Sequence, residues 1–123
     1  MCGVAGCVEF GGRLSELARD RIGVAVGKMR RRGPDGNGVV CGDGYIFGHA
    51  RLAIIDPAHG RQPCMDESTG VMLTYNGEIY NFQELRRELE SKGHVFRTRC
   101  DTEVLLRARS EERRVGKECR SRW

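Results

Sequence analysis

The sequence of 123 residues lacks the short motifs that mark several common enzyme classes. It has neither of the glycine-rich phosphate loops, G-x-x-x-x-G-K-S/T and G-x-G-x-x-G, no H-E-x-x-H zinc motif and no G-x-S-x-G serine elbow. Its six cysteines form no C-x-x-C pair and match no zinc spacing. We therefore expect no metal site and no nucleotide-binding loop in this chain.

Long apolar runs and a secretory leader are also missing. No stretch is long enough to cross a membrane, and no basic segment precedes the short apolar start. The net charge of +4 is not gathered into one long run, and the arginine-rich segments lack interleaved aromatics, which argues against nucleic-acid binding. We expect a cytoplasmic protein with reduced thiols, although a disulfide-rich secreted protein stays open on the cysteine count alone.

Hydrophobic periodicity and turn residues predict several short strands and three helices. Strands are expected at residues 2–8, 38–41, 45–49, 51–55, 71–75 and 95–98, and helices at 14–32, 81–93 and from 101 onward. Because strands and helices do not alternate regularly, the pattern favours an α+β fold. Residues 110–123 lack apolar periodicity and are expected to form a disordered tail.

Cys2 is the first candidate for a catalytic group. Cysteine is small enough for Met1 to be removed, which would leave a thiol and a free α-amine on one residue. This amine has an ordinary pKa of about 7.7–8.0, so it can accept the thiol proton near neutrality and later pass it to a leaving amine. Two alternatives are a structural Cys2 inside a buried strand and a Cys100–His94 pair of nucleophile and base.

Three further positions could bind or stabilise a substrate. Asn76-Gly77 follows an apolar strand and forms either a hairpin turn or an oxyanion hole, made by the Asn76 side-chain amide and the Gly77 backbone N–H. Arg51 could bind the carboxylate of a free amino acid bidentately, and Asp101 could pair with its ammonium group. The alternatives for Arg51 and Asp101 are a strand-edge salt bridge and a helix N-cap.

Five segments, taken together and in order, resemble one protein family. They are residues 1–6 (MCGVAG), 32–36 (RGPDG), 49–56 (HARLAIID), 75–82 (YNGEIYNF) and 101–103 (DTE). They are similar to the glutaminase domain of glutamine-hydrolysing asparagine synthetases, which are class II (N-terminal nucleophile) glutamine amidotransferases. The resemblance covers residues 2–109 and implies an N-terminal-nucleophile hydrolase fold, a four-layer αββα sandwich that would be incomplete on its C-terminal side. Residues 110–123 have no counterpart in the family.

The resemblance also implies the residues of the site. Cys2 is the implied nucleophile and carries its own base. Asn76 and Gly77 are the implied oxyanion donors. Arg51 would hold the glutamine carboxylate, and Glu78 and Asp101 would bind the α-amino group. The pocket would be lined by Leu52, Ile54 and Ile55. No metal ligand is implied.

The implied activity is hydrolysis of glutamine to glutamate and ammonia through a thioester on Cys2. The ammonia would amidate aspartate in a synthetase domain that uses ATP and Mg²⁺ and is expected to be missing here, while the glutaminase part needs no cofactor. Glutamine and that domain are the expected partners, and the intact enzyme could form a homodimer. Alternatives are a related amidotransferase with a different acceptor, a non-catalytic binding module and an inactive fragment.

Overall fold

A computed structural model describes the backbone of residues 1–120 and the side chains of residues 1–112. In chain order the elements are β1 (Gly3–Val8), α1 (Glu16–Lys28), the 3₁₀ helix η1 (Met29–Arg31), β2 (Gly36–Cys41), β3 (Tyr45–Arg51), β4 (Cys64–Asp66), β5 (Val71–Leu73), α2 (Phe82–Ser91) and α3 (Asp101–Arg120). This mixture of helices and antiparallel strands confirms the expected α+β class. Within the described part of the chain, no helix is both long and apolar enough to cross a membrane.

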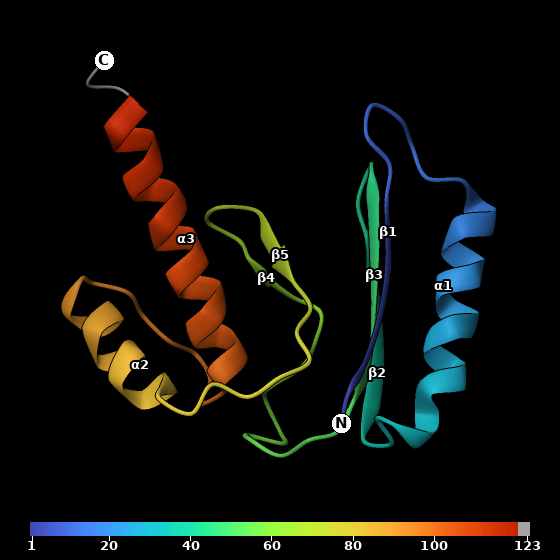
Figure 1. Ribbon diagram of the computed structural model, residues 1–123, viewed down its shortest axis with the longest axis horizontal. Coiled ribbons are helices and arrows are strands. Elements are labelled where there is room, and N and C mark those ends of the chain that lie inside the picture. The colour runs from blue at the N-terminus through green and yellow to red at the C-terminus, as the bar shows by residue number, and fades with distance from the viewer. Residues whose placement is uncertain (121–123) are drawn as a thin grey trace.

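The strands form two antiparallel sheets. In the first sheet β3 lies between β1 and β2, and in the second β4 pairs with β5. Figure 1 shows the layers in succession: α1, the three-stranded sheet, the β4–β5 sheet, and then α3 with α2. The register pairs Gly3 with Ala50, so the chain just before β1 lies beside the chain just after β3.

α1 covers one face of the three-stranded sheet. Ser15 caps its first turn by accepting a hydrogen bond from the backbone N–H of Ala18. Helix and sheet approach each other closely at Gly48, where an added Cβ would meet the side chains of Val26 and Ile22. Gly48 thus lets these two side chains pack directly on the backbone of β3.

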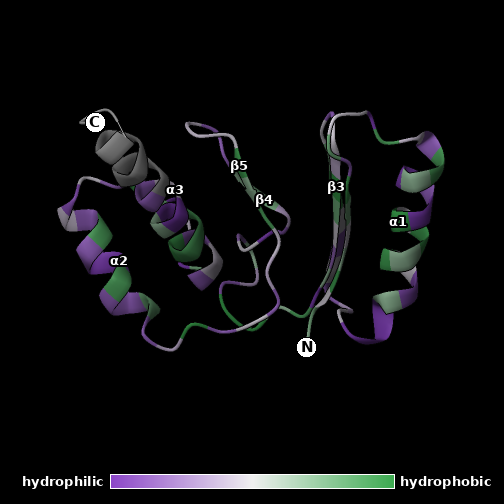
Figure 2. Ribbon diagram, turned by 45° about the horizontal axis from the view of Figure 1, so that its top comes forward, coloured by the Kyte–Doolittle hydropathy of each residue, from purple (hydrophilic) through white to green (hydrophobic). Residues whose placement is uncertain are grey.

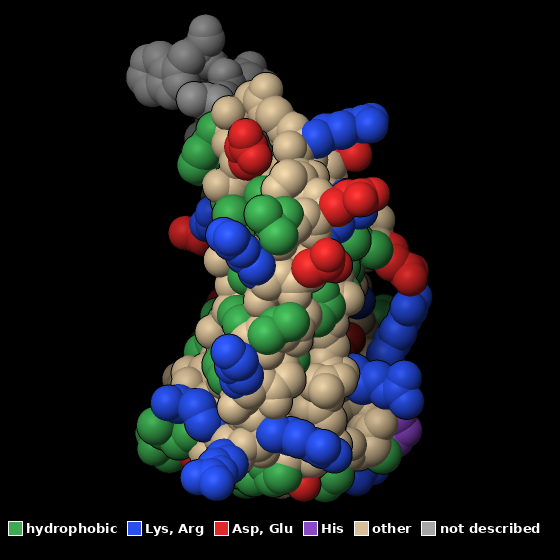
Figure 3. Space-filling model, turned by 90° about the vertical axis from the view of Figure 1, so that its right-hand side faces the viewer, with side chains coloured by type: hydrophobic (Ala, Val, Ile, Leu, Met, Phe, Trp, Pro, Cys, Tyr) green, Lys and Arg blue, Asp and Glu red, His purple; other side chains and the backbone are tan. Residues whose placement is uncertain are grey.

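The opposite side of α1 carries apolar side chains among charged ones. Leu17 is 58% exposed and Val24 is 57% exposed, and hydrophobic and hydrophilic residues are mixed along the whole helix (Figure 2). Seen from this side, Lys and Arg side chains gather at the lower end, where α1 passes into η1 (Figure 3). The apolar residues that predicted this helix therefore lie on both of its faces.

Residues 32–35 of the R-G-P-D-G segment connect η1 to β2 as a loop. Gly33 is buried against the backbone of Ala50, and a Cβ on Gly33 would overlap that backbone. The Asp35 carboxylate accepts a hydrogen bond from the Ala53 N–H (2.8 Å), and the Asp35 N–H donates to the Arg51 carbonyl (3.0 Å). The loop therefore fixes the chain at the point where it leaves β3.

The strand predicted at residues 51–55 is wrong, because the chain leaves the sheet after Arg51. The carboxylate of Asp35 takes the Ala53 N–H that a neighbouring strand would otherwise accept. The Arg51 guanidinium donates to the carbonyl of Ile55. Side chains therefore satisfy backbone groups that a sheet would satisfy in a strand.

The strand predicted at residues 95–98 is also wrong, for a similar reason. The Glu103 carboxylate accepts hydrogen bonds from the backbone N–H groups of Arg97 and Thr98, at 3.0 Å and 2.7 Å. The Arg86 guanidinium donates to the Thr98 carbonyl (2.7 Å). In contrast, β4 lies within residues 56–70, where only turns were predicted.

α3 continues past the boundary predicted at Arg109. The helix extends to Arg120, so the predicted disorder from residue 110 is wrong over the part that the structure describes, while residues 121–123 lie outside it. Ser110 is buried, and its hydroxyl donates to the Asp66 carboxylate (2.7 Å). Polar contacts with distant residues hold the helix at Ser110 and Glu111.

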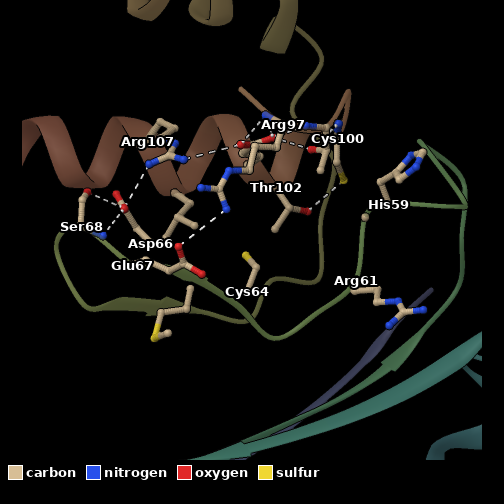
Figure 4. Close-up of a pocket in the computed structure, with 15 residues that line it drawn as sticks. His59, Arg61, Cys64, Asp66, Glu67, Ser68, Arg97, Cys100, Thr102 and Arg107 are labelled. Atoms are coloured by element: carbon tan, nitrogen blue, oxygen red, sulfur yellow. Dashed lines mark hydrogen bonds and ion pairs between the residues drawn. The ribbon is translucent and has the colours of Figure 1, made fainter. Parts of the chain in front are cut away.

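Asp66 ties the β4–β5 sheet to α3. It is 3% exposed, and its Oδ1 lies 3.0 Å from Nη1 of Arg107 (Figure 4). The hydroxyls of Ser68 and Ser110 donate to its two oxygens, at 2.6 Å and 2.7 Å. Burial by itself would raise the pKa of Asp66, but these hydrogen bonds and the Arg107 charge hold it well below its usual range.

We expect Asp66→Asn to destabilise the fold by about 3 kcal/mol near pH 7, because it removes the nearer of the two carboxylates that pair with the Arg107 guanidinium, the other being Glu103 at 3.8 Å. A carboxylate whose pKa is depressed on folding stabilises the fold above its unfolded pKa of about 3.9, and this contribution is lost as the pH falls below that value. In urea unfolding, the difference between the wild type and the variant should therefore shrink between about pH 4 and pH 2. Asp43→Asn, at an exposed position, is the control, and a pH-independent difference would contradict the role of Asp66.

Gly33→Ala should destabilise the fold by about 1–3 kcal/mol, because the added methyl group meets the backbone of Ala50 and no flexible side chain can move away. Gly36→Ala, at the first residue of β2, is the control, since nothing lies within 4 Å of a Cβ at that position. Its free energy of unfolding should stay within about 0.5 kcal/mol of the wild type. Equal losses in thermal or urea unfolding would show that the contact with Ala50 is not the cause.

Candidate active site

A cavity of about 290 Å³ opens where the end of β3, the start of β1, the chain after β5 and the first turn of α3 meet. This volume is close to the lower limit of about 300 Å³ for small-molecule sites. All nine site residues predicted from the sequence line it: Cys2, Arg51, Leu52, Ile54, Ile55, Asn76, Gly77, Glu78 and Asp101. The fold therefore brings the predicted residues together, and their individual roles stay predictions.

Cys2 precedes β1, and the register that pairs Gly3 with Ala50 brings it beside the chain at the end of β3. The Leu52 N–H points at Sγ of Cys2, with 3.3 Å between nitrogen and sulfur, and Sγ lies 3.6 Å from the Leu52 carbonyl oxygen. Nε of Arg32 donates to the Cys2 carbonyl (3.3 Å). The thiol is half-buried and lines the cavity, so these contacts fix the sulfur while leaving it accessible.

Backbone carbonyls of the following loop orient the Arg51 guanidinium. Nη1 donates to the Pro57 carbonyl (2.8 Å), and Nη2 donates to the carbonyls of Ile55 (3.1 Å) and Asp56 (2.8 Å). These bonds use three of the five N–H groups of the side chain, so two remain for a ligand. A guanidinium held in this way suits a planar carboxylate better than a freely rotating cation would.

Asn76, Gly77 and Glu78 form an exposed rim of the cavity. No backbone hydrogen bond within the described chain engages their N–H groups, so the Gly77 N–H is free to donate to a ligand. A Cβ on Gly77 would meet the phenol ring of Tyr75, so a larger residue here would require that ring to move. Burial, followed by the charges of Asp101 and Glu78, raises the pKa of Tyr75.

Asp101 is the first residue of α3 and is 5% exposed. Its Oδ2 accepts a hydrogen bond from the Ile79 N–H (3.1 Å), and its Oδ1 lies 3.5 Å from Oγ1 of Thr102. Among the described side chains no Lys or Arg forms an ion pair with it. A buried carboxylate without a cationic partner is a suitable binding group for an ammonium ion.

The alternative pair of Cys100 and His94 is not assembled by the described contacts. Nε2 of His94 lies 2.9 Å from the Glu111 carboxylate. The Cys100 thiol instead lies 3.5 Å from Oγ1 of Thr102. Burial raises the pKa of Cys100, so its thiolate is disfavoured near neutral pH.

The histidines offer no general base to the cavity, since none of the three lines it. His49 is fully buried, and its Nδ1 lies 3.0 Å from Oγ1 of Thr74. Burial, assisted by the Arg51 charge, lowers the pKa of His49, so its imidazole is neutral near pH 7. His49 is a structural contact between the two sheets.

Several residues outside the predicted site also line the cavity: Met1, Gln62, Tyr75, Tyr80, Thr102, and Cys100, which had been considered only as an alternative nucleophile. Most of them neighbour predicted residues in the sequence, but Gln62 does not, and only the fold brings it to the site. Arg32 and Asp35 were interpreted as parts of a loop, although they hold Cys2 and Ala53. In the sequence, the charged residues Arg32 and Asp35 on either side of Gly33-Pro34 are the signal that could have indicated these contacts.

A second cavity, of about 260 Å³, lies next to the first, and Cys100 and Thr102 line both. Figure 4 shows Cys64 and Cys100 on its wall. Burial raises the pKa of Cys64 to about 11, so this thiol is protonated near neutral pH. Within the described chain, no group of His, Cys, Asp and Glu side chains could hold a metal ion.

Comparison with known proteins identifies the family. Residues 1–123 match the family described as glutamine amidotransferase domain. The chain is 41% identical over 110 residues to glutamine-hydrolyzing asparagine synthetase 3 of Bacillus subtilis (strain 168), an alignment that covers 86% of this chain and 17% of the relative. It is 45% identical over 109 residues to glutamine-hydrolyzing asparagine synthetase 1 of Arabidopsis thaliana, covering 85% and 18%, and 44% identical over 108 residues to the Zea mays enzyme, covering 85% and 17%. The chain thus spans less than a fifth of the length of these relatives, and it belongs to the glutamine amidotransferase domain family.

Proposed function

We propose that the cavity hydrolyses the side-chain amide of glutamine, with Cys2 as the nucleophile. The observation that carries this proposal is the convergence of an accessible thiol, an unengaged Gly77 N–H and the buried carboxylate of Asp101 on one cavity. These groups match the three demands of the reaction: attack on a carbonyl carbon, stabilisation of an oxyanion and recognition of an amino acid.

The proposed reaction begins after removal of Met1. The α-amine of Cys2 accepts the thiol proton while Sγ attacks the amide carbon, and the carbonyl electron pair moves to oxygen. The Asn76 side-chain amide and the Gly77 N–H donate hydrogen bonds to that oxygen. The amine then passes its proton to the amide nitrogen, the C–N bond breaks and ammonia leaves. Water attacks the resulting thioester, the C–S bond breaks, and glutamate is released with the thiol restored.

Recognition of the free amino acid would use one cationic and one anionic side chain of the cavity wall. An N–H group of the Arg51 guanidinium that the loop carbonyls leave unengaged would bind the α-carboxylate. Asp101 and Glu78 would bind the α-ammonium, for which Asp101 is the stronger group because it is desolvated and lacks a cationic partner. Leu52, Ile54 and Ile55 would contact the aliphatic part of the substrate.

We further propose that the chain is the glutaminase part of a longer asparagine synthetase. Support comes from the names of its relatives and from the 17–18% of their length that it spans. Ammonia would pass to a synthetase domain that uses ATP and Mg²⁺ to amidate aspartate, whereas the residues described here would need no cofactor. The intact protein would be cytoplasmic, could form a homodimer and would bind neither nucleic acid nor membranes. The layers in Figure 1 would belong to a complete αββα sandwich.

Replacement of the nucleophile gives the direct test. Cys2→Ala should lower the rate of glutamate release from glutamine by more than about a thousandfold, because no other group can form the thioester. Cys41→Ser, at an exposed cysteine in β2, is the matched control and should keep the wild-type rate. Mass spectrometry of the quenched wild type should show the γ-glutamyl adduct on the N-terminal peptide. Turnover by Cys2→Ala at the wild-type rate would refute the proposed function.

A further inference from the structure

We propose that Gln62 is a positioning residue for the hydrolysis of glutamine, acting through the chain segment that carries Asn76 and Gly77. This inference rests on the proposed function of the cavity. The side-chain amide of Gln62 joins this segment to the first turn of α3, and no sequence motif singled it out.

The amide of Gln62 is engaged at both ends. Its Oε1 accepts a hydrogen bond from the Tyr75 N–H (2.7 Å), and its Nε2 donates to Oγ1 of Thr102 (3.1 Å). Both bonds are part-buried, and Gln62 itself lines the cavity. One side chain thereby connects the residue before Asn76 to the residue after Asp101.

The far end of the same segment is fixed to the same turn of α3. The Ile79 N–H donates to Oδ2 of Asp101 (3.1 Å), and the Thr102 hydroxyl lies 3.5 Å from Oδ1 of Asp101. The segment from Tyr75 to Ile79 is therefore anchored at each end. Tyr75 is connected through Gln62 to Thr102, Ile79 is bonded to Asp101, and these two α3 residues are adjacent. Between the anchors, Gly77 keeps its N–H free for the substrate.

Side-chain anchors matter here because regular structure does not hold the segment. β5 ends at Leu73 and α2 begins at Phe82, so no strand or helix sets the backbone of the residues between them. Oxyanion donors stabilise a transition state only when they are already oriented before the reaction. The bond from Tyr75 to Gln62 lies one residue away from Asn76, which makes it the nearest constraint on that donor.

The effect of losing Gln62 should appear in kcat more than in KM. The oxyanion exists only in the transition state and the tetrahedral intermediate, so misplaced donors weaken interactions that the ground state does not make. Sγ of Cys2 is held by Leu52 and by the β1–β3 pairing instead. The intrinsic reactivity of the thiol should therefore be unaffected.

The test replaces Gln62 by Met, which has a similar length and forms neither hydrogen bond. Gln83→Met, on the exposed side of α2, is the matched control at the other glutamine of the chain. Gln62→Met should lower kcat for glutamine hydrolysis by about tenfold to a hundredfold with a smaller change in KM. Alkylation of Cys2 by iodoacetamide, followed on the N-terminal peptide by mass spectrometry, should proceed at the wild-type rate because it needs no oxyanion hole. Gln83→Met should match the wild type in both assays.

Thr102→Val provides a second variant, since it removes only the α3 end of the connection and should lower kcat in the same direction. A wild-type kcat in both variants would overturn the role of Gln62. Equal losses of hydrolysis and of Cys2 alkylation would also overturn it, because they would report general damage to the fold. A wild-type chain that is alkylated at Cys2 but does not turn over glutamine would instead refute the proposed function itself.

Discussion

The antiparallel pairing of β1 with β3 is the interaction on which the cavity depends. Its register brings Cys2 to the end of β3, where Leu52 contacts the thiol and Arg51 begins the cavity wall. A slip of one residue would turn the side chains of β1 to the other face of the sheet. The R-G-P-D-G loop prevents the end of β3 from moving, because Gly33 packs on its backbone and Asp35 binds the chain beyond it.

The second half of the molecule supplies the groups that face Cys2, and polar contacts align the two halves. The Asp56 carboxylate, in the loop after β3, accepts a hydrogen bond from the Arg99 N–H (2.9 Å) just before α3. This bond and the contact with His59 lower the pKa of Asp56. His49 of β3 contacts Thr74 after β5 at 3.0 Å. Such bonds fix directions as well as distances, which suits a cavity whose proposed oxyanion donors must point at one oxygen atom.

Local signals were enough to predict the α+β class, the first strand and helix, and the start of α3 at Asp101. The order of five motifs was enough to predict nine residues that line one cavity. What the sequence could not reveal depends on contacts between distant residues. Glu103 occupies the backbone groups of 97 and 98 and prevents a strand there, and Asp66 binds Ser110 at the point where the sequence of α3 loses its apolar residues. Gln62 is a third case, since its partners are 13 and 40 residues away.

The central claim is that Cys2 reacts with a glutamine side chain whose oxygen is held by Asn76 and Gly77. The most direct measurement is a crystal structure of the chain after reaction with a chloroketone analogue of glutamine. The account predicts a covalent bond to Sγ of Cys2, a free α-amine on that residue, and the analogue's carbonyl oxygen within hydrogen-bond distance of the Asn76 amide and the Gly77 N–H. A bond to another cysteine, or a carbonyl oxygen directed away from both donors, would contradict it.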